Sequence, residues 1–418
     1  MNPERIIAGL DIGSAKTTVV IAEAIGERKS TPSLRILGVG QARTTGLRKG
    51  VVSDIEETTR SIKKAVEDAE RMAGTKIDTI YAGIAGEHVR AMISKGIVAV
   101  NGEEISKADV DRANDVARAQ PIPQDRELLH AIPQEYSVDK NQGIRDPIGM
   151  IGTRLETEMY LVTIGASPAM NLRKSVERAG YRVRELVLEP LASALSVLTE
   201  DEKELGVALV EMGAGTTDIA VFHEGKIRHL GTVNYGGNNV TSDIVQGIGV
   251  TQADAERLKE RYGCAYEPLV DPTDNIQLPS TVAQGERHVP REVLAHIIHQ
   301  RMDEIFNLVL REIQRAGFAT RLNGGVVVTG GAAAMEGVAD LAADVFGTGV
   351  RIGSPSENIG GLADSVDAPR FATVVGLALY GAHRAAAGFS ATSKHRAFAG
   401  AGVDKFTKRL KIWLEDFF

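Results

Sequence analysis

Two short turns in this chain place an acidic residue just before small residues, between apolar runs. In "GLDIGSAKTTVVI", Asp11 precedes Gly13, and in "LVEMGAGTTDIAV", Glu211 precedes Gly213. Turns of this kind can expose backbone N–H groups to phosphates, while the nearby carboxylates hold a hydrated cation. The pattern therefore predicts a site for a nucleotide together with Mg²⁺.

The two stretches align without a gap, so that Asp11 meets Glu211 and Thr17 meets Thr217. Chance could produce one such pair, but a third strand-to-helix turn, "GGVVVTGGAAAMEGV", favours an internal repeat. Other phosphate motifs fail: the chain has no G-x-x-x-x-G-K-[ST] sequence, and the second turn lacks the third Gly of a dinucleotide fingerprint. Neither a P-loop nor a Rossmann site is expected.

Composition bounds the class of protein. A chain of 418 residues is expected to form at least two domains. With 48 basic against 55 acidic residues, the net charge of −7 argues against a general nucleic-acid partner. The single cysteine, Cys264, excludes an internal disulfide framework and suits a reducing compartment. The first residues are too weakly apolar for a signal peptide, and no apolar run is long enough to span a bilayer. We therefore expect a cytoplasmic body.

The elements that must position the turns can also be predicted. Apolar β-branched runs over residues 5–26 predict strand, turn and strand. A capping-box pattern at Ser53 and Glu56 predicts the start of a helix that reaches about Met72. A polar helix is expected near 106–119, within a segment whose Pro-rich stretch precedes the next strands.

These features resemble the actin-like ATPases, and the resemblance narrows to the FtsA family of bacterial cell-division proteins. It rests on the paired turns, "LLHAIPQEYSVDKNQGIRDPIGMIGTRLE", "SVLTEDEKELGVALVEMGAGTTDIAV", "NNVTSDI" and the amphipathic end of the chain. The likeness covers nearly the whole chain. It implies an α/β, actin-like (ribonuclease-H-like) duplicated fold: two lobes around a nucleotide cleft, an FtsA-specific inserted subdomain and a C-terminal amphipathic helix.

The resemblance implies the following division of the chain: subdomain 1A at 1–85 and 161–204, the inserted subdomain 1C at 86–160, subdomain 2A at 205–242 and 305–368, subdomain 2B at 243–304, a closing helix at 369–388, a flexible linker at 389–403 and an amphipathic membrane-targeting helix at 404–418.

The resemblance also implies which residues bind ATP. The first phosphate turn would be Asp11, Gly13, Ser14, Ala15 and Lys16, with Lys16 reaching the β-phosphate. The second would be Glu211, Gly213, Ala214, Gly215, Thr216 and Thr217. The adenosine contacts would be Gly330, Gly331, Ala332, Gly237, Asn238, Glu256 and Lys259. Glu256 and Lys259 could instead form an ordinary surface salt bridge on a helix.

Glu189 matches the position at which the superfamily orients the water that attacks the γ-phosphate. It could equally be a carboxylate that serves a helix dipole. Asp11 and Glu211 would hold Mg²⁺ through water. The chain departs from the superfamily at Glu211, where Asp is usual, and at Ala214, where Gly is usual. The extra methylene moves a carboxylate by about 1.5 Å, and such a displacement can cost about a hundredfold in rate. We expect slow ATP hydrolysis at best.

The end of the chain, "DKFTKRLKIWLEDFF", has the pattern of an amphipathic helix. At 100° per residue, one arc holds Phe406, Leu410, Trp413, Leu414, Phe417 and Phe418. Lys408 and Arg409 lie among the basic residues outside it. A helix of this type suits a membrane interface. Docking on the body of the protein is the alternative that the residues alone leave open, and resemblance to the FtsA membrane-targeting helix favours the membrane.

The resemblance implies a function: an ATP-binding protein that polymerises and tethers FtsZ filaments to the inner face of the cytoplasmic membrane, helping to assemble the Z ring and recruit later division proteins. The C-terminal peptide of FtsZ would contact Arg291, Arg301 and Asn307, because an acidic peptide needs cationic and amide donors on a helical face. The alternatives are an actin-like pilus-assembly adaptor and a small-molecule kinase of the same superfamily.

Overall fold

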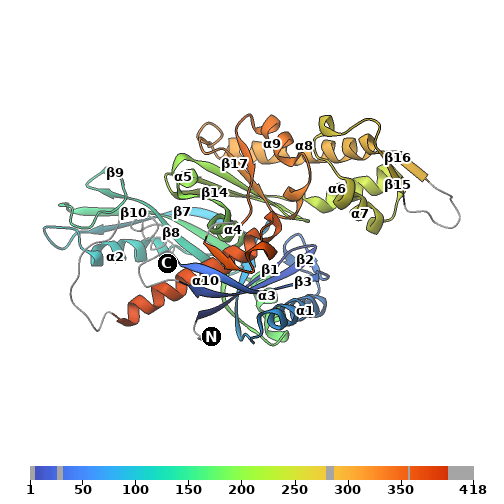
Figure 1. Ribbon diagram of the computed structural model, residues 1–418. Coiled ribbons are helices and arrows are strands. Elements are labelled where there is room, and N and C mark those ends of the chain that lie inside the picture. Colours follow the sequence, from blue (N-terminus) through green and yellow to red (C-terminus); the bar gives the residue numbers. More distant parts are fainter. Residues whose placement is uncertain (1–4, 26–31, 279–286, 356–357, 394–418) are drawn as a thin grey trace.

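The computed structural model describes residues 5–25, 32–278, 287–355 and 358–393. Figure 1 shows two lobes, one below and one above, with the inserted subdomain at one end and a helix-rich region at the other. Each lobe is built on a twisted sheet, and the long helix α10 lies near the middle of the molecule.

The first sheet, in lobe 1, has six strands among the described residues. In spatial order they are β11 (Arg182–Leu188), β6 (Thr79–Ile84), β1 (Ile6–Ile12), β2 (Lys16–Ile25), β3 (Ser33–Arg43) and β19 (Ile359–Gly361). The hairpin β1–β2 and the pair β2–β3 are antiparallel, whereas β1–β6 and β6–β11 are parallel.

The second sheet, in lobe 2, repeats this arrangement. Its strands, in spatial order, are β18 (Val350–Ile352), β17 (Val326–Thr329), β12 (Val207–Met212), β13 (Thr217–His223) and β14 (Lys226–Val233). The pairs β12–β13 and β13–β14 are antiparallel, and β12–β17 and β17–β18 are parallel, as in lobe 1. The internal repeat predicted from the sequence is therefore a repeat of the fold, and the predicted duplication is confirmed.

Helices cover the sheet of lobe 1. They are α1 (Ile55–Ala73), α3 (Ala166–Arg178), α4 (Glu189–Val197) and α10 (Ala372–Ser393), with the short strands β4 (Leu47–Arg48) and β5 (Val51–Val52) before α1. The short helix α5 (Glu200–Leu205) packs against β13 of lobe 2 instead. The predicted start of α1 was wrong by one residue. Asp54, not Ser53, is the N-cap, and its carboxylate accepts the N–H of Glu57 at 2.9 Å.

The inserted subdomain is a four-stranded sheet with one helix. Its strands, in spatial order, are β7 (Arg90–Ala99), β10 (Arg154–Gly165), β8 (Arg126–Val138) and β9 (Asn141–Ile144), and its helix is α2 (Lys107–Arg118). The helix confirms the expectation near 106–119. The Pro-rich stretch is less of a break than its composition suggests, since β8 runs through Pro133. The register between β8 and β10 shifts directly after that residue, at Gln134, and a bulge is a place where a strand tolerates proline.

The helix-rich region joins lobe 2 at its outer end. It contains α6 (Gly237–Ile244), a π-helical turn (Val245–Gly249), α7 (Gln252–Tyr262), a 3₁₀ turn (Glu267–Leu269), β15 (Asn275–Leu278), β16 (Arg287–Pro290) and α8 (Arg291–Arg315). Lobe 2 is completed by a 3₁₀ turn at Gly331–Ala334 and by α9 (Val338–Phe346). Of the two later 3₁₀ turns, Ala363–Ser365 lies against β3 of lobe 1, and Pro369–Phe371 contacts both α10 and the turn at Gly331–Ala334. Helix α8 is continuous across the predicted boundary at 304 and 305, and one apolar core joins both sides of it.

The end of the chain is described only in part. Helix α10 continues to Ser393, past the start of the predicted linker at 389. The amphipathic segment 404–418 lies outside the described residues, so its predicted membrane contacts stay predictions. Among the residues that the structure describes, no helix is long and apolar enough to cross a bilayer.

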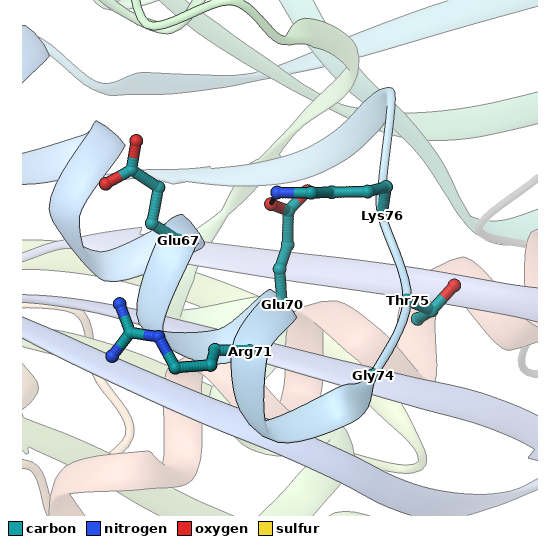
Figure 2. Close-up of a pocket in the computed structure, with 6 residues that line it drawn as sticks. All are labelled: Glu67, Glu70, Arg71, Gly74, Thr75 and Lys76. Carbon is teal, nitrogen blue, oxygen red and sulfur yellow. Dashed lines mark hydrogen bonds and ion pairs between the residues drawn. The ribbon is translucent and has the colours of Figure 1, made fainter.

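A shallow pocket lies at the end of α1 (Figure 2). The carboxylate of Glu70 already accepts from Lys76 Nζ at 2.5 Å and from the N–H of Ile77 at 3.0 Å. These bonds fix the loop that follows the helix. The pocket is far from the first phosphate turn, because β3 meets this end of α1 at Gly38, well away from the tip of the β1–β2 hairpin.

Candidate nucleotide-binding site

The two predicted phosphate turns have the same backbone geometry. In the first, the N–H of Gly13 donates to the carbonyl of Lys16 at 3.1 Å, and in the second, the N–H of Gly213 donates to the carbonyl of Thr216 at 2.9 Å. The acids stand at equivalent positions, since Asp11 pairs with Thr18 across one hairpin and Glu211 with Asp218 across the other. One turn type has thus been kept in both halves of the chain.

The turns of the two lobes meet in space. A Cβ atom placed on Gly215 would lie 2.7 Å from Ser14 Oγ and 3.5 Å from the Cα of Lys49, so an added side chain would force Ser14 to move. Ala15 and Lys16 are exposed at the tip of the first turn. The structure therefore brings the predicted halves of the phosphate site together across the boundary between the lobes.

The predicted ribose and adenine contacts gather behind the second turn. Lys259 Nζ donates to the carbonyl of Gly237 at 3.1 Å and to Glu256 at 2.8 Å, and the nearest side chain from the third turn is Ala332. The alternative of a salt bridge on a helix surface is half right: the pair exists, but Lys259 is mostly buried against α6. Its amine fixes the start of α6, where only the side chain of Asn238 is exposed.

The start of α6 is bound to the second turn through the backbone. The N–H of Gly237 donates to the carbonyl of Gly213 at 3.0 Å, and the N–H of Asn238 donates to that of Ala214 at 2.8 Å. These two amide donors are therefore used inside the protein. The side chain of Thr217 adds a third link, to the carbonyl of Tyr235 at 2.9 Å.

The third turn closes the same side of the site. Gly330 has φ of +90°, and a Cβ there would lie 2.5 Å from the carbonyl oxygen of Met212, so the turn presses directly on the end of β12. A Cβ on Gly331 would meet nothing within 4 Å. Gly331 therefore borders open space, as a contact for adenosine requires.

Four carboxylates converge where the two lobes meet. The pKa of Glu189 is raised well above its usual value by burial, and then by the charges of Asp11, Glu211 and Asp218. Burial raises the pKa of Asp11 to about 7. Burial also raises the pKa of Glu211 to about 8, although a hydroxyl bond from Thr373 opposes this shift. Burial is the main cause of these shifts, with repulsion between the acids adding to it at Glu189 and Glu211, and raised pKa values of this kind are common at functional sites.

The four acids differ in what surrounds them. Glu211 is 9% exposed and accepts hydroxyl bonds from Ser193, at 2.8 Å, and from Thr373. These two residues lie on α4 and near the start of α10. Glu189 is the first residue of α4 and points to the same acids, as both of its predicted roles allow.

Sequence reasoning missed Asp218. It is 6% exposed and accepts from Thr232 at 2.7 Å and from Thr216 at 3.1 Å, and the N–H of Gly86 at the start of the inserted subdomain also donates to it. The signal was present in the repeat, where Asp218 aligns with Thr18, because a buried acid that replaces a hydroxyl needs a reason.

The donor set fits a hydrated Mg²⁺ ion. Oxygen ligands are those that Mg²⁺ prefers, and the ion usually keeps several waters. In the described part of the chain, no three His, Cys, Asp or Glu side chains are close enough to hold a metal directly. The ligation of Mg²⁺ by Asp11 and Glu211 through water stays a prediction.

The residues predicted to bind FtsZ lie on α8 but are engaged within the protein. Arg301 forms two bonds to Asp243, at 2.5 and 3.0 Å, and Arg291 pairs with Glu336 at 2.5 Å. Asn307 bonds within its own helix. At 100° per residue the three positions do not share one narrow face. The assignment stays a prediction, and the structure does not bring the three side chains together.

Comparison with known proteins decides the family. A family model described as "Cell division protein FtsA" matches residues 208–376, and one described as "SHS2 domain inserted in FTSA" matches 86–163, beside the predicted insert at 86–160. The chain is 40% identical over 412 residues to the cell division protein FtsA of Pseudomonas aeruginosa, covering 98% of each chain. The chain belongs to the FtsA family of cell-division proteins. The FtsA of Escherichia coli is 38% identical, with 98% of this chain and 97% of that one covered.

Solved structures share the fold of this FtsA-family chain. One titled "PilM-PilN type IV pilus biogenesis complex" has a TM-score of 0.63 at 17% identity, covering 90% of this chain and 98% of that one. MreB5 of Spiroplasma citri bound to ADP has a TM-score of 0.55 at 15% identity, covering 90% and 95%. At such identities the likeness concerns the fold alone, so it confirms the actin-like architecture and does not favour a pilus adaptor over a division protein.

Proposed function

We propose that this FtsA-family chain binds ATP between its lobes, polymerises, and tethers FtsZ filaments to the inner face of the cytoplasmic membrane. The observation that carries the nucleotide site is the meeting of two equivalent turns, with Ser14 against Gly215, beside four converging carboxylates. A triphosphate placed there would find backbone donors from both lobes.

Each part of the site has a role in this proposal. Lys16, exposed at the tip of the first turn, supplies a mobile positive charge to the phosphates. Asp11 and Glu211 would hold Mg²⁺ through water, and the ion would supply charge neutralisation to the phosphates. Gly331 and Asn238 border the space for adenosine and ribose. Contacts from both lobes would make the angle between the lobes sensitive to the nucleotide.

The hydrolytic step is proposed to be slow. Glu189 would orient water at the γ-phosphate, but its carboxylate is crowded by three other acids. Glu211, with its longer side chain, is already held by the hydroxyls of Ser193 and Thr373. A group held elsewhere cannot position water well, and displacements near 1 Å can cost about a hundredfold in rate.

The membrane and FtsZ roles rest on the sequence of the tail and on the family. Its apolar arc with Trp413 and three Phe residues suits an interfacial helix, and its basic residues add attraction to anionic lipid. Polymerisation is proposed because the fold is actin-like and the titles of solved relatives include a filament, the "MamK double helical filament", with a TM-score of 0.51. Later division proteins and the FtsZ peptide are the proposed partners.

Co-sedimentation with liposomes tests this function. The full chain, a truncation that ends at Gly402 and a Trp413→Asp variant would be spun with anionic vesicles, with and without ATP and Mg²⁺, in the presence of FtsZ. Ile412→Asp, which adds the same charge outside the apolar arc, is the matched control. We expect the full chain and the control to carry FtsZ to the vesicles, and the other two proteins to leave it in solution. Recruitment by the truncation would refute the role of the tail.

A further inference from the structure

A histidine of the inserted subdomain is hydrogen-bonded to the end of the strand that precedes Glu189. His130 lies on β8, and its Nε2 accepts the N–H of Leu188 at 3.1 Å. Leu188 is the last residue of β11, an edge strand of the lobe 1 sheet whose strand partner is β6. The imidazole therefore supplies the acceptor that a neighbouring strand would otherwise provide for the N–H of Leu188. A buried N–H without an acceptor is costly.

The surroundings of His130 keep its ring in one state and orientation. The residue is 6% exposed, and its ring meets that of Tyr380 on α10 edge-on, with centroids 6.3 Å apart. Burial, with a smaller effect from the charge of Arg384, lowers the pKa of His130 to about 4. The neutral ring at physiological pH has one acceptor nitrogen, and Leu188 uses it.

The other side of the turn is set just as tightly. Glu189 follows Leu188 directly, and its side chain lies on Gly83 of β6, where an added Cβ would be 2.8 Å from the Cγ of Glu189. Earlier in β11, Glu185 accepts from Tyr380 at 2.6 Å and from Arg384 at 3.1 Å, so α10 holds the middle of the strand. The junction at Leu188 is thus the point at which the inserted subdomain, lobe 1 and α10 all act on Glu189.

We propose that His130 is a positioning residue for Glu189: through the N–H of Leu188, the inserted subdomain sets the direction in which that carboxylate faces the nucleotide site. This inference rests on the proposed nucleotide function and deepens it. It makes the inserted subdomain a contributor to the site, so a partner that moves β8 would alter the orientation of Glu189 without touching the nucleotide.

Two substitutions at His130 separate positioning from packing. His130→Leu fills similar space and removes the acceptor, whereas His130→Gln keeps an acceptor oxygen near the place of Nε2. Tyr380→Phe keeps the ring contact and removes the bond to Glu185, so it controls for loosening of the same core. Should His130→Leu fail to fold, His130→Asn replaces it, because its amide is too short to reach Leu188.

Three measurements on the full chain are needed. Equilibrium binding of ATP with Mg²⁺ should change less than about twofold in His130→Leu, because His130 is not part of either phosphate turn. Single-turnover hydrolysis should fall at least about tenfold, since misplaced groups lose rate steeply, and His130→Gln should recover most of it. In a Glu189→Gln background the same change should have no further effect. Hydrogen exchange of the Leu188 amide should rise in His130→Leu and stay low in His130→Gln and Tyr380→Phe.

The outcomes are distinct. Exchange at Leu188 that is unchanged in His130→Leu, or faster exchange with unchanged turnover, overturns the positioning role. An additive loss in the Glu189→Gln background does so as well. A wild-type chain that binds ATP without any turnover also overturns it, because Glu189 then has no water to orient, while the nucleotide site stands. A chain that binds no ATP removes the proposed nucleotide function itself.

Discussion

The two lobes have sheets of the same topology and the same turn, but the acid before that turn has different surroundings in each lobe. In lobe 1, Asp11 is half-buried beside the tip of the hairpin, and this burial already raises its pKa. In lobe 2, Glu211 is buried and accepts two hydroxyl bonds from residues of α4 and α10. The pairing of strands around both acids is the same. The backbone of the duplicated unit thus fixes where an acid stands, and its neighbours decide what it can do.

The strands that end each half differ in the same way. In lobe 1, β11 passes into α4 at Glu189, under the hydrogen bond from Leu188 to His130. In lobe 2, the equivalent β18 is followed by Gly353, whose N–H donates to Val328 at 2.8 Å. The end of β11 is thus bonded to a side chain of the inserted subdomain, whereas the residue after β18 is bonded to the neighbouring strand β17. The contrast is consistent with the proposal that Glu189 of lobe 1 orients water while Glu211 of lobe 2 is held by hydroxyls.

The largest expected effect is a loss of folding stability at low pH that depends on His130. The folded-state pKa of His130, about 4, lies below its usual 6.5, so the unfolded chain binds a proton between these values while the folded chain does not. His130 therefore contributes stability above pH 6.5 that is lost as the pH falls toward 4, by about 3 kcal/mol at 1.36 kcal/mol per pKa unit. Denaturant unfolding at pH 7 and pH 4 should show a smaller acid loss in His130→Gln. Equal losses in both proteins would contradict this.

Removal of Asp11 should weaken nucleotide binding more than removal of Glu211. Asp11→Ala should weaken binding of ATP with Mg²⁺ by about a hundredfold, because charge-assisted contacts are worth about 1.5–3 kcal/mol. Glu211→Ala should weaken it several-fold less, since hydroxyls hold that carboxylate. Titration calorimetry on both variants measures the difference. Equal losses would show that the two acids serve the cation alike.

The same two variants should show the reverse order in folding stability, with the larger loss in Glu211→Ala. Glu211→Ala leaves the hydroxyls of Ser193 and Thr373 with only each other, at 3.1 Å, and opens a buried space. We expect a loss of about 2 kcal/mol in the free energy of unfolding. Asp11→Ala removes a partly exposed acid from a cluster of like charges and should cost less than about 0.5 kcal/mol. Urea unfolding without nucleotide makes the comparison, and the reverse order would refute it.

Glycine substitutions should give the smallest effect and sharpen the symmetry. A Cβ on Gly13 or on Gly213 would lie 3.1 Å from the carbonyl of residue 16 or 216, so Gly13→Ala and Gly213→Ala should cost similar amounts. Gly215→Ala would press on Ser14 at 2.7 Å and should cost about 1 kcal/mol more. Thermal unfolding of the three variants tests this order. Three equal losses would mean that the turns are not in contact.

Local sequence patterns and the internal repeat could predict much of the fold. Apolar runs around a glycine turn predicted the hairpins, and the repeat predicted the shared sheet order. The exact cap of α1 was missed because Ser53 and Asp54 are both good capping residues. Strand β8 was obscured because Pro133 is tolerated at a bulge that sequence alone does not show.

The remainder of the site depends on contacts between distant parts of the chain. Ser193 and Thr373 are far apart in sequence, yet both reach Glu211. His130 reaches Leu188 from another subdomain. The periodicity of the sequence does not indicate contacts between residues so far apart. The partners of the acids were therefore found only in the folded structure.

Binding of ATP by the full chain is the measurement that shows whether turns from both lobes form one nucleotide site. Calorimetric titration with ATP and Mg²⁺ would be run on the wild type, on Lys16→Ala from the first turn and on Gly215→Val from the second. We expect one site per chain and a loss of affinity of at least about tenfold in each variant, since each turn supplies contacts to the phosphates. Absence of binding to the wild type, or full affinity in either variant, would contradict it.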